Sequence, residues 1–214
     1  MNVQDFPLNT DEGTGQALIG AAAAVLAKRR SDIPATFLAE LLGAAVPDDL
    51  QRFGEDELAA IAERSWSLLA ARKAGAPKIG FEPAPVTRTV TVLDIINDDM
   101  PFLLDSVVGE LNQRGLDIRL LVHPVFAVER DSAGTLTAFK GAAKDGGRHE
   151  SFIHIHIEGV AEAARREIVG ALEDVLAQVR VAGAGSKLIL GAPALRSANS
   201  DHDRSAMAAS SSGP

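Results

Sequence analysis

One stretch in the middle of the chain restricts the fold most, because its periodicity changes twice within a short distance. The run RTVTVLDII (residues 88–96) is apolar and β-branched, which predicts a buried strand. The next residues, NDDMPFLLDSVVGELNQRG (97–115), predict a helix with Pro101 in its first turn and Gly115 at its end. The run LDIRLLVHPVFAVER (116–130) then alternates as a second strand does. We therefore predict a strand–helix–strand unit.

The residues that follow complete an α+β domain. The run SFIHIHIE (151–158) alternates strictly, which predicts a strand with its isoleucines inward and with His154 and His156 outward. The run VAEAARREIVGALEDVLAQV (160–179) has the period of an amphipathic helix, and RVAG (180–183) could begin a last strand. The order βαββα, with this optional last β, is that of a ferredoxin-like domain with an antiparallel sheet and two helices on one face.

Two further expectations follow from this order. Pro124 interrupts the second strand, and proline is tolerated at a sheet edge, which is where the topology puts that strand. The inward positions of the strands and helices are expected to form one core. They are Ile95, Leu103, Val107, Leu111, Leu120, Val122, Phe126, Ile153, Ile155, Leu172 and Val175.

Composition divides the chain into five parts. A flexible N-terminus (1–13) precedes a region of helical periodicity (14–74), and a linker with three prolines and two glycines (75–87) separates that region from the α+β domain (88–181). The last part (182–214) draws 19 of its 33 residues from Gly, Ala and Ser, and we predict that it is a disordered tail.

Charge and composition narrow the class of partner. A net charge of −8 disfavours a nucleic-acid partner, because phosphate binding relies on clustered Lys and Arg. The absence of cysteine excludes disulfides and thiolate chemistry and suits the cytoplasm, which is the expected location. The start of the chain is acidic, unlike a signal peptide, and the apolar run 17–27 is too short to span ~30 Å of hydrocarbon. No membrane partner is expected.

The acidic turn between the first strand and helix is the first candidate site. Backbone N–H groups at a helix N-terminus can hold an anionic ligand, and the turn supplies Asn97, Asp98, Asp99, Met100 and Phe102 as candidate ligand-binding residues. Alternatively, Asp98 or Asp99 caps the helix. We favour capping, because two adjacent carboxylates repel an incoming anion.

Three histidines form the second candidate site. His154 and His156 lie two residues apart on one strand face, and His123 is expected on the same open face of a neighbouring strand. Three imidazoles are an acceptable zinc ligand set, but no acidic residue obviously completes it. We therefore expect no metal site and interpret these residues as surface or dimer-interface histidines, with a pH-sensitive interface as an alternative.

A resemblance to a known family rests on residues 91–136, TVLDIINDDMPFLLDSVVGELNQRGLDIRLLVHPVFAVERDSAGTL. This run resembles the N-terminal region of the large NAD-specific glutamate dehydrogenases of bacteria, and the likeness covers roughly residues 88–181. The resemblance implies an ACT-like domain, in agreement with the βαββα order. It also implies an amino-acid site at the turn between the first strand and helix, pairing through edge strands, and a regulatory or oligomerising role.

Two departures from the family pattern matter. Ligand-binding ACT domains carry D-x-P-G-L-L at the turn, whereas Phe102 stands here in place of the glycine and is expected to crowd a ligand. The family's NAD fold and catalytic residues lie far downstream of this region, so the chain alone is expected to bind no cofactor and to be inactive. We hypothesise a truncated or frameshifted piece of a longer dehydrogenase, whose partner is that remainder or a second copy. A free-standing amino-acid-binding module is the alternative.

Overall fold

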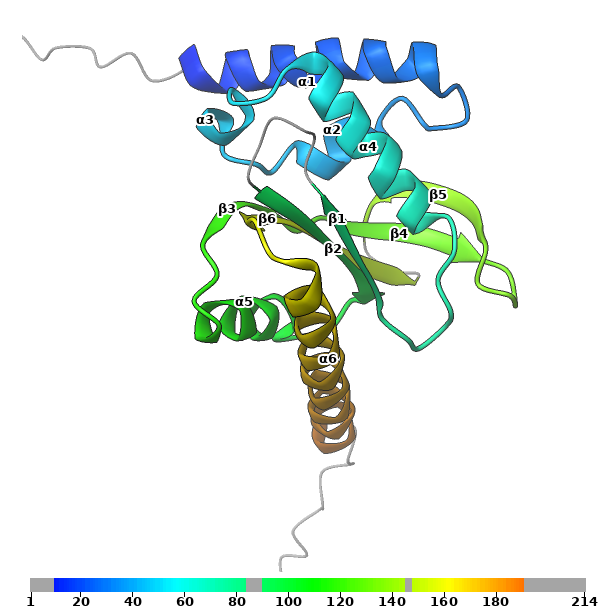
Figure 1. Ribbon diagram of the computed structural model, residues 1–214. Helices are drawn as coiled ribbons and strands as arrows, with labels where there is room; N and C mark the ends of the chain where they lie inside the picture. The colour runs from blue at the N-terminus through cyan, green and yellow to red at the C-terminus, as the bar shows by residue number, and fades with distance from the viewer. Residues whose placement is uncertain (1–9, 84–89, 145–147, 191–214) are drawn as a thin grey trace, which may run out of the picture.

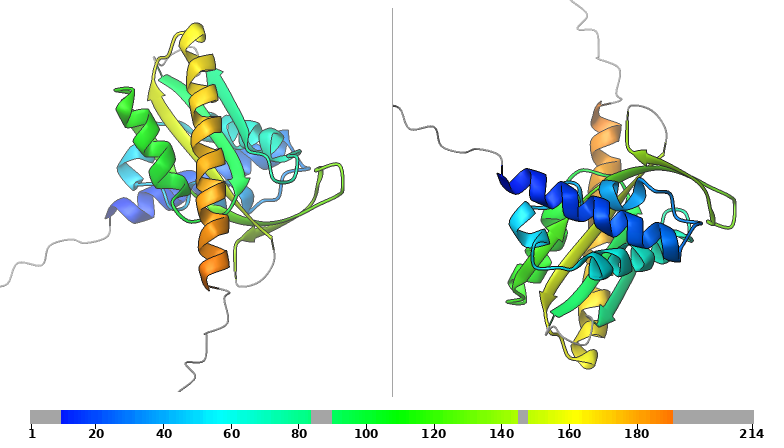
Figure 2. Two further views of the ribbon diagram at one scale, coloured as in Figure 1. Left: turned by 90° about the horizontal axis from the view of Figure 1, so that it is seen from below. Right: turned by 90° about the horizontal axis from the view of Figure 1, so that it is seen from above.

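The computed structural model describes residues 10–83, 90–144 and 148–190 (Figure 1). Their helices and strands form three layers, in which an antiparallel sheet lies between two groups of helices. Seen from below and from above, α5 and α6 cross one face of the sheet, while the N-terminal helices cover the other (Figure 2). The predicted α+β class with an antiparallel sheet is confirmed.

The N-terminal helices make up one layer, which we call the helical layer. It consists of α1 (Thr10–Arg29), α2 (Phe37–Leu42), α3 (Pro47–Leu50) and α4 (Glu55–Leu69). Helix α4 begins at an acidic first turn, where the Glu57 side chain accepts a hydrogen bond from the Gly54 backbone N–H at 2.9 Å. The apolar side of α4 is fully buried, because it faces the other helices and the sheet.

Six strands form the sheet. They are β1 (Lys78–Pro83), β2 (Val90–Asp98), β3 (Ile118–Val122), β4 (Val125–Arg130), β5 (Leu136–Ala142) and β6 (His149–Glu158). The order is β1-β2-β6-β4-β5, and β3 also pairs with β6. Pro124 separates β3 from β4, and its carbonyl accepts a hydrogen bond from Phe152 N at 2.9 Å. The proline therefore lies at the break between two strands that pair with different halves of β6.

A strand from an earlier part of the chain occupies the position expected for the last strand. Residues 180–183 continue helix α6 (Glu162–Leu190), so they form no strand. Instead β1, which lies inside the expected linker, pairs antiparallel with β2 along Lys78–Pro83. The described structure thus keeps the neighbours of a ferredoxin-like sheet, but its outer strand precedes the domain in the chain.

The centre of the sheet, formed by β2 and β6, is buried on both faces, which divides the core in two. Ten of the eleven expected core residues are buried, while Val175 is half-buried and Leu176 and Val179 are buried beside it. Leu120, Val122 and Phe126 pack with the helical layer, whereas the seven other buried members belong to a second core with α5 (Leu103–Gln113) and α6. The prediction of one core and of an open sheet face is therefore wrong, because the helical layer covers the second face.

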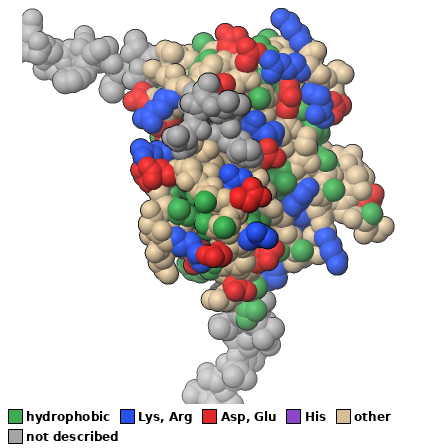
Figure 3. Space-filling view, viewed as in Figure 1, with side chains coloured by type: hydrophobic (Ala, Val, Ile, Leu, Met, Phe, Trp, Pro, Cys, Tyr) green, Lys and Arg blue, Asp and Glu red, His purple; other side chains and the backbone are tan. Residues whose placement is uncertain are grey.

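Parts of the two predicted flexible ends belong to helices. The predicted tail lies outside the described residues from 191 on, and residues 182–190 belong to α6; of the predicted flexible N-terminus, residues 10–13 belong to α1. Among the described residues, no helix is both long and apolar enough to cross a bilayer. On the face shown in Figure 3, acidic and basic side chains are interspersed over both helices and sheet.

Candidate functional site

The turn after β2 has an unusual backbone. Phe102 precedes the first residue of α5 with φ 64°, the left-handed conformation that glycine adopts readily and that costs other residues about 1–2 kcal/mol. Its side chain is 69% exposed, so the ring does not fill the turn. The residue that departs from the family pattern therefore keeps a backbone shape suited to glycine.

The two aspartates of the turn do not cap the helix. Asp98 still belongs to β2, and its carboxylate accepts hydrogen bonds from Arg72 at 2.6 Å, Arg180 at 2.9 Å and Arg148 at 3.2 Å. Asp99 accepts the hydroxyl of Ser151 at 2.6 Å. No side chain caps α5. The capping prediction is wrong because the strand runs through Asp98 and the helix starts only at residue 103.

The arginines around Asp98 change its ionisation. Partial burial works to raise the pKa of Asp98, but the hydrogen bonds from Arg180 and Arg72 outweigh it and lower the pKa to about 2. Arg180 also donates to Asn97 Oδ1 at 2.8 Å, and Asn97 Nδ2 lies 4.0 Å from Met100 Sδ. The polar candidates of the turn are thus engaged by the protein's own side chains, which fix the shape of the turn.

A buried charge network continues from the turn into the domain. Glu150 is fully buried and accepts hydrogen bonds from Arg72 Nη2 at 2.7 Å and from Arg130 Nε and Nη2 at 2.9 and 2.8 Å. Burial works to raise the pKa of Glu150, and the two arginines lower it. Arg130 also donates to Leu69 O at the end of α4 at 2.9 Å. The network therefore ties the helical layer to the sheet.

The three candidate histidines are not brought together. His123 lies near Asp99 at the turn, where burial lowers its pKa against the opposing effect of Asp99. Its Nε2 atom is buried and has no hydrogen-bond partner among the described residues. No group of three or more His, Cys, Asp or Glu in the described ranges could hold a metal ion.

His154 and His156 lie inside the molecule and not on its surface. They are 1% and 4% exposed, on the sheet face that the helical layer covers. His154 Nδ1 lies 2.5 Å from Asp94 Oδ1, and His154 Nε2 lies 2.9 Å from His156 Nε2. The outward assignment is wrong, and an acidic partner exists after all. We call these three residues the Asp–His–His trio.

The partner Asp94 was missed although the sequence carried a signal for it. It is the one charged residue in the apolar run 90–96, and β2 pairs it directly with His154 across the sheet. A charge inside an apolar strand calls for a buried partner. Edge-to-face packing of Phe53 on His156, with ring centroids 5.4 Å apart, places the end of the trio under the helical layer.

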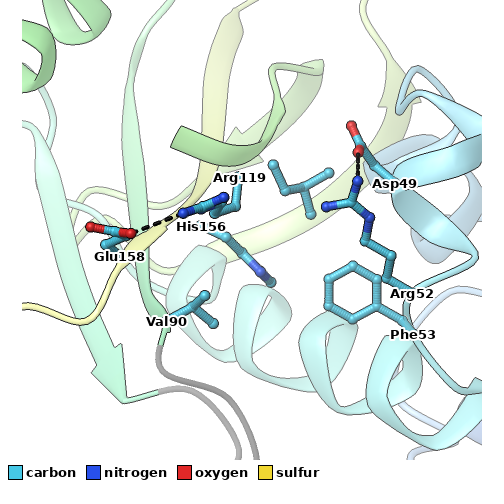
Figure 4. A pocket seen from close by; sticks show the side chains of 8 residues that line it. Asp49, Arg52, Phe53, Val90, Arg119, His156 and Glu158 are labelled. Atoms are coloured by element: carbon cyan, nitrogen blue, oxygen red, sulfur yellow. Dashed lines mark hydrogen bonds and ion pairs between the residues drawn. The ribbon is translucent and has the colours of Figure 1, made fainter. Parts of the chain in front are cut away.

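A pocket of about 200 Å³ opens beside His156. Its walls come from both layers: Asp49, Arg52 and Phe53 from the helical layer, and Val90, Arg119, Leu120, His156 and Glu158 from the sheet. Figure 4 shows the Arg119 guanidinium turned toward Glu158, 2.9 Å away, and Arg52 toward Asp49, 3.8 Å away. The pocket is therefore lined by charges of both signs and by apolar groups.

Comparison with known proteins identifies a family that matches this chain. The family model described as glutamate dehydrogenase, ACT1 domain, matches residues 37–172, an interval that includes most of the helical layer and the whole sheet. The NAD-specific glutamate dehydrogenase of Halomonas elongata is 33% identical over 153 residues, which cover 67% of this chain and 10% of that protein. The protein of the same name from Pseudomonas aeruginosa is 30% identical over 142 residues, covering 63% of this chain and 9% of that protein. No solved structure matches. The chain spans about a tenth of the length of these relatives.

Proposed function

Because the chain belongs to the glutamate dehydrogenase ACT1 domain family, we propose that it is a regulatory and assembly module of an NAD-dependent glutamate dehydrogenase. Such an enzyme deaminates L-glutamate oxidatively to 2-oxoglutarate and ammonia. The observation that carries the proposal is the match over residues 37–172, which spans α2, α3 and α4 together with the whole sheet. The proposed location is the cytoplasm.

The chemistry of the dehydrogenase is proposed to lie in parts of the enzyme other than this region. NAD is commonly held by a glycine-rich turn between a strand and a helix. One glycine-containing run, GAGSKL (residues 183–188), lies within helix α6 and not at such a turn. We propose that this chain binds no dinucleotide by itself and that the role of NAD belongs to the whole enzyme.

Assembly is proposed to use an edge of the sheet. The outer side of β1 pairs with no other strand in the described part of the chain, and four of its residues, 78–81, are half-buried. An open strand edge offers backbone N–H and C=O groups for pairing with another chain. A second copy of this module, or another part of the dehydrogenase, is the proposed partner.

A deletion and a chimera test this function in a relative. The region equivalent to residues 37–172 is deleted from the Halomonas elongata enzyme, and in a second version it is replaced by these residues. We expect the deletion to change the oligomeric state or the response to amino acids, and the chimera to restore it. The isolated chain should show no glutamate-dependent NAD reduction. Unchanged assembly and regulation after deletion, or activity of the isolated chain, would contradict the proposal.

A second candidate function is amino-acid binding at the turn after β2. It is favoured by the exposed ring of Phe102 and by the buried His123 Nε2, a polar atom beside the turn without a partner among the described residues. Calorimetry with a panel of amino acids tests it, and we expect heat from at least one of them. Absence of heat at millimolar concentration rejects this candidate, and His123→Phe serves as the matched variant that should lose any binding observed.

A further inference from the structure

The charge network at the end of the sheet contains more arginines than carboxylates. In the described part of the chain, ion pairs join two carboxylates, Asp98 and Glu150, to four guanidinium groups, those of Arg72, Arg130, Arg148 and Arg180. Backbone carbonyl groups accept further N–H groups of two of these arginines but carry no net charge. The residues joined by these ion pairs therefore have an excess of two positive charges, although the whole chain has a net charge of −8.

The excess positive charge is poorly screened and acts on its surroundings. The side chains of Arg72 and Arg130 are 1% and 2% exposed, so little water solvates their charges. Burial lowers the pKa of Lys78, and the charge of Arg130 lowers it further. The buried Nε atom of Arg72 has no hydrogen-bond partner within the ranges that the structure describes. An anion beside the network would offset the excess charge.

A hollow of about 460 Å³ lies next to the network. Arg130 and Arg148 of the network line it, and the rest of its wall comes from the β4–β5 hairpin: Ala127, Val128, Glu129, Thr137 and Lys140. Seen from below, this hairpin extends beyond α6 (Figure 2). The hollow thus combines three cationic side chains with one opposing carboxylate, and it is separate from the turn after β2.

Two of the cationic side chains can turn toward a ligand without loss of the fold. Arg148 is 45% exposed, and its hydrogen bond to Asp98, at 3.2 Å, is the longest of the three that Asp98 accepts from arginines. Lys140 is 56% exposed and pairs with Glu129, which is 57% exposed. Exposed ion pairs of this kind are weak, so a ligand can displace both contacts at little cost.

We propose that this hollow binds the phosphoryl group of a small ligand, held by Arg148, Lys140 and the hydroxyl of Thr137. Arg130 contributes its charge from behind while it stays bound to Glu150. Asp98 keeps its shorter hydrogen bonds to Arg72 and Arg180 when Arg148 turns to the ligand.

The charge and the size of the hollow define the ligand. A phosphoryl group carries about −1.5 to −2 charge at neutral pH, which matches the excess of the network, whereas a single carboxylate offsets only half of it. Its oxygens can accept from a guanidinium, an ammonium and a hydroxyl group at once. The volume lies within the ~300–1,000 Å³ typical of small-molecule pockets, so the hollow also admits a small organic group.

Calorimetry on the full chain tests the proposal, with inorganic phosphate and glycerol 3-phosphate as probes and with succinate and acetate as controls at equal ionic strength. We expect both phosphates to bind with a dissociation constant of about 1 mM or lower. Tighter binding of the ester would identify a phosphate ester as the ligand, and equal binding would identify the free anion. Succinate and acetate should bind at least about tenfold more weakly. Equal binding of succinate, or no binding of either phosphate, would overturn the proposal.

Four variants locate the site. Arg148→Gln and Lys140→Gln should each weaken phosphate binding at least about tenfold, because each removes a charge-assisted hydrogen bond. Arg119→Gln is the matched control, since this side chain is 48% exposed and lies outside the hollow; binding should not change. Glu129→Gln removes the opposing carboxylate and should strengthen binding by up to about fivefold. Unchanged binding in Arg148→Gln, or weaker binding in Glu129→Gln, would overturn the site assignment.

Amide chemical shifts of the full chain give an independent readout of the location. Phosphate should shift the signals of β4, β5 and Arg148, and also that of Asp98, because Arg148 contacts its carboxylate. Shifts confined to the helical layer would place the anion elsewhere and overturn the proposal. All these measurements use this chain alone, so a negative result leaves the proposed assembly role unaffected.

Discussion

Replacement of Glu150 with glutamine probes the buried network that joins the helical layer to the sheet. Glutamine preserves the volume of the side chain, so no cavity forms. The remaining oxygen can still accept from Arg72 and Arg130 at the Oε1 position, but the amide nitrogen at the Oε2 position faces Arg130 Nη2, a donor against a donor. Arg72 and Arg130, whose side chains are 1% and 2% exposed, also lose their shared countercharge.

The magnitude follows from these losses. One hydrogen bond to a charged group is worth about 1.5–3 kcal/mol, and breaking a buried ion pair costs about 3–5 kcal/mol. Because two of the three hydrogen bonds persist in Glu150→Gln, we expect a loss of about 3 kcal/mol in the free energy of unfolding. At roughly 2–4 °C per kcal/mol for a chain of this size, Tm falls by about 6–12 °C.

Urea unfolding at pH 7, followed by far-UV circular dichroism, measures this change. The matched control is Glu158→Gln, which removes a carboxylate from a pair with Arg119 whose side chains are 59% and 48% exposed. Exposed pairs contribute about 0–1 kcal/mol, so the control should shift little. If Glu150→Gln costs no more than Glu158→Gln, the buried network does not stabilise the fold more than an exposed ion pair does.

Three further predictions concern the turn and the layers. Phe102→Gly relieves the left-handed backbone strain of about 1–2 kcal/mol but increases the conformational entropy of the unfolded chain, which costs about 0.5–1 kcal/mol. We therefore expect a slightly higher urea midpoint, and a decrease of more than about 1 kcal/mol in the free energy of unfolding would contradict this. The lowered pKa of Asp98 contributes about 2 kcal/mol of stability, which is present above the ordinary pKa of 3.8 and is lost as pH falls toward 2. Asp98→Asn should abolish this acid dependence of Tm in melts recorded at several pH values. The single tryptophan, Trp66, is half-buried and packs on Phe37, with ring centroids 5.0 Å apart, against a core that spans both layers. Its fluorescence and the circular dichroism should therefore change in one coincident transition, and separate transitions would show that the layers unfold independently.

Hydrophobic periodicity predicted the helices and strands that form mainly from their local sequence. The strand over β2, the helix over α5 and the strand over β6 are each long and regular, and the structure contains all three. The strand β1 was not predictable in the same way, because KIGFEP is short and flanked by prolines and glycines. It becomes a strand through pairing with β2, which is a tertiary effect that local composition does not carry.

The site residues differed in predictability for a similar reason. Strict alternation of His and Ile indicates a sheet with one solvent-exposed and one buried face. This inference fails when a second layer of helices covers the face that was expected to be exposed. The acidic turn looked like a helix cap because its local sequence suits one, whereas Arg72 and Arg180 come from distant segments and recruit Asp98 for the network. The position of such partners follows only from the assembled fold.

The strand contributed from upstream has a mechanical consequence for α6. Because β1 pairs with β2, it occupies the position at which a strand after α6 would join the sheet. Helix α6 instead continues past the sheet (Figure 1). Its 29 residues make a rod of about 44 Å at ~1.5 Å per residue. Arg180 clamps this rod to Asn97 and Asp98 at the end of β2. The ten residues from Arg180 to Leu190 extend about 15 Å beyond this contact, so a tilt of α6 by about 5° at Arg180 would move the end of the helix by about 1.3 Å.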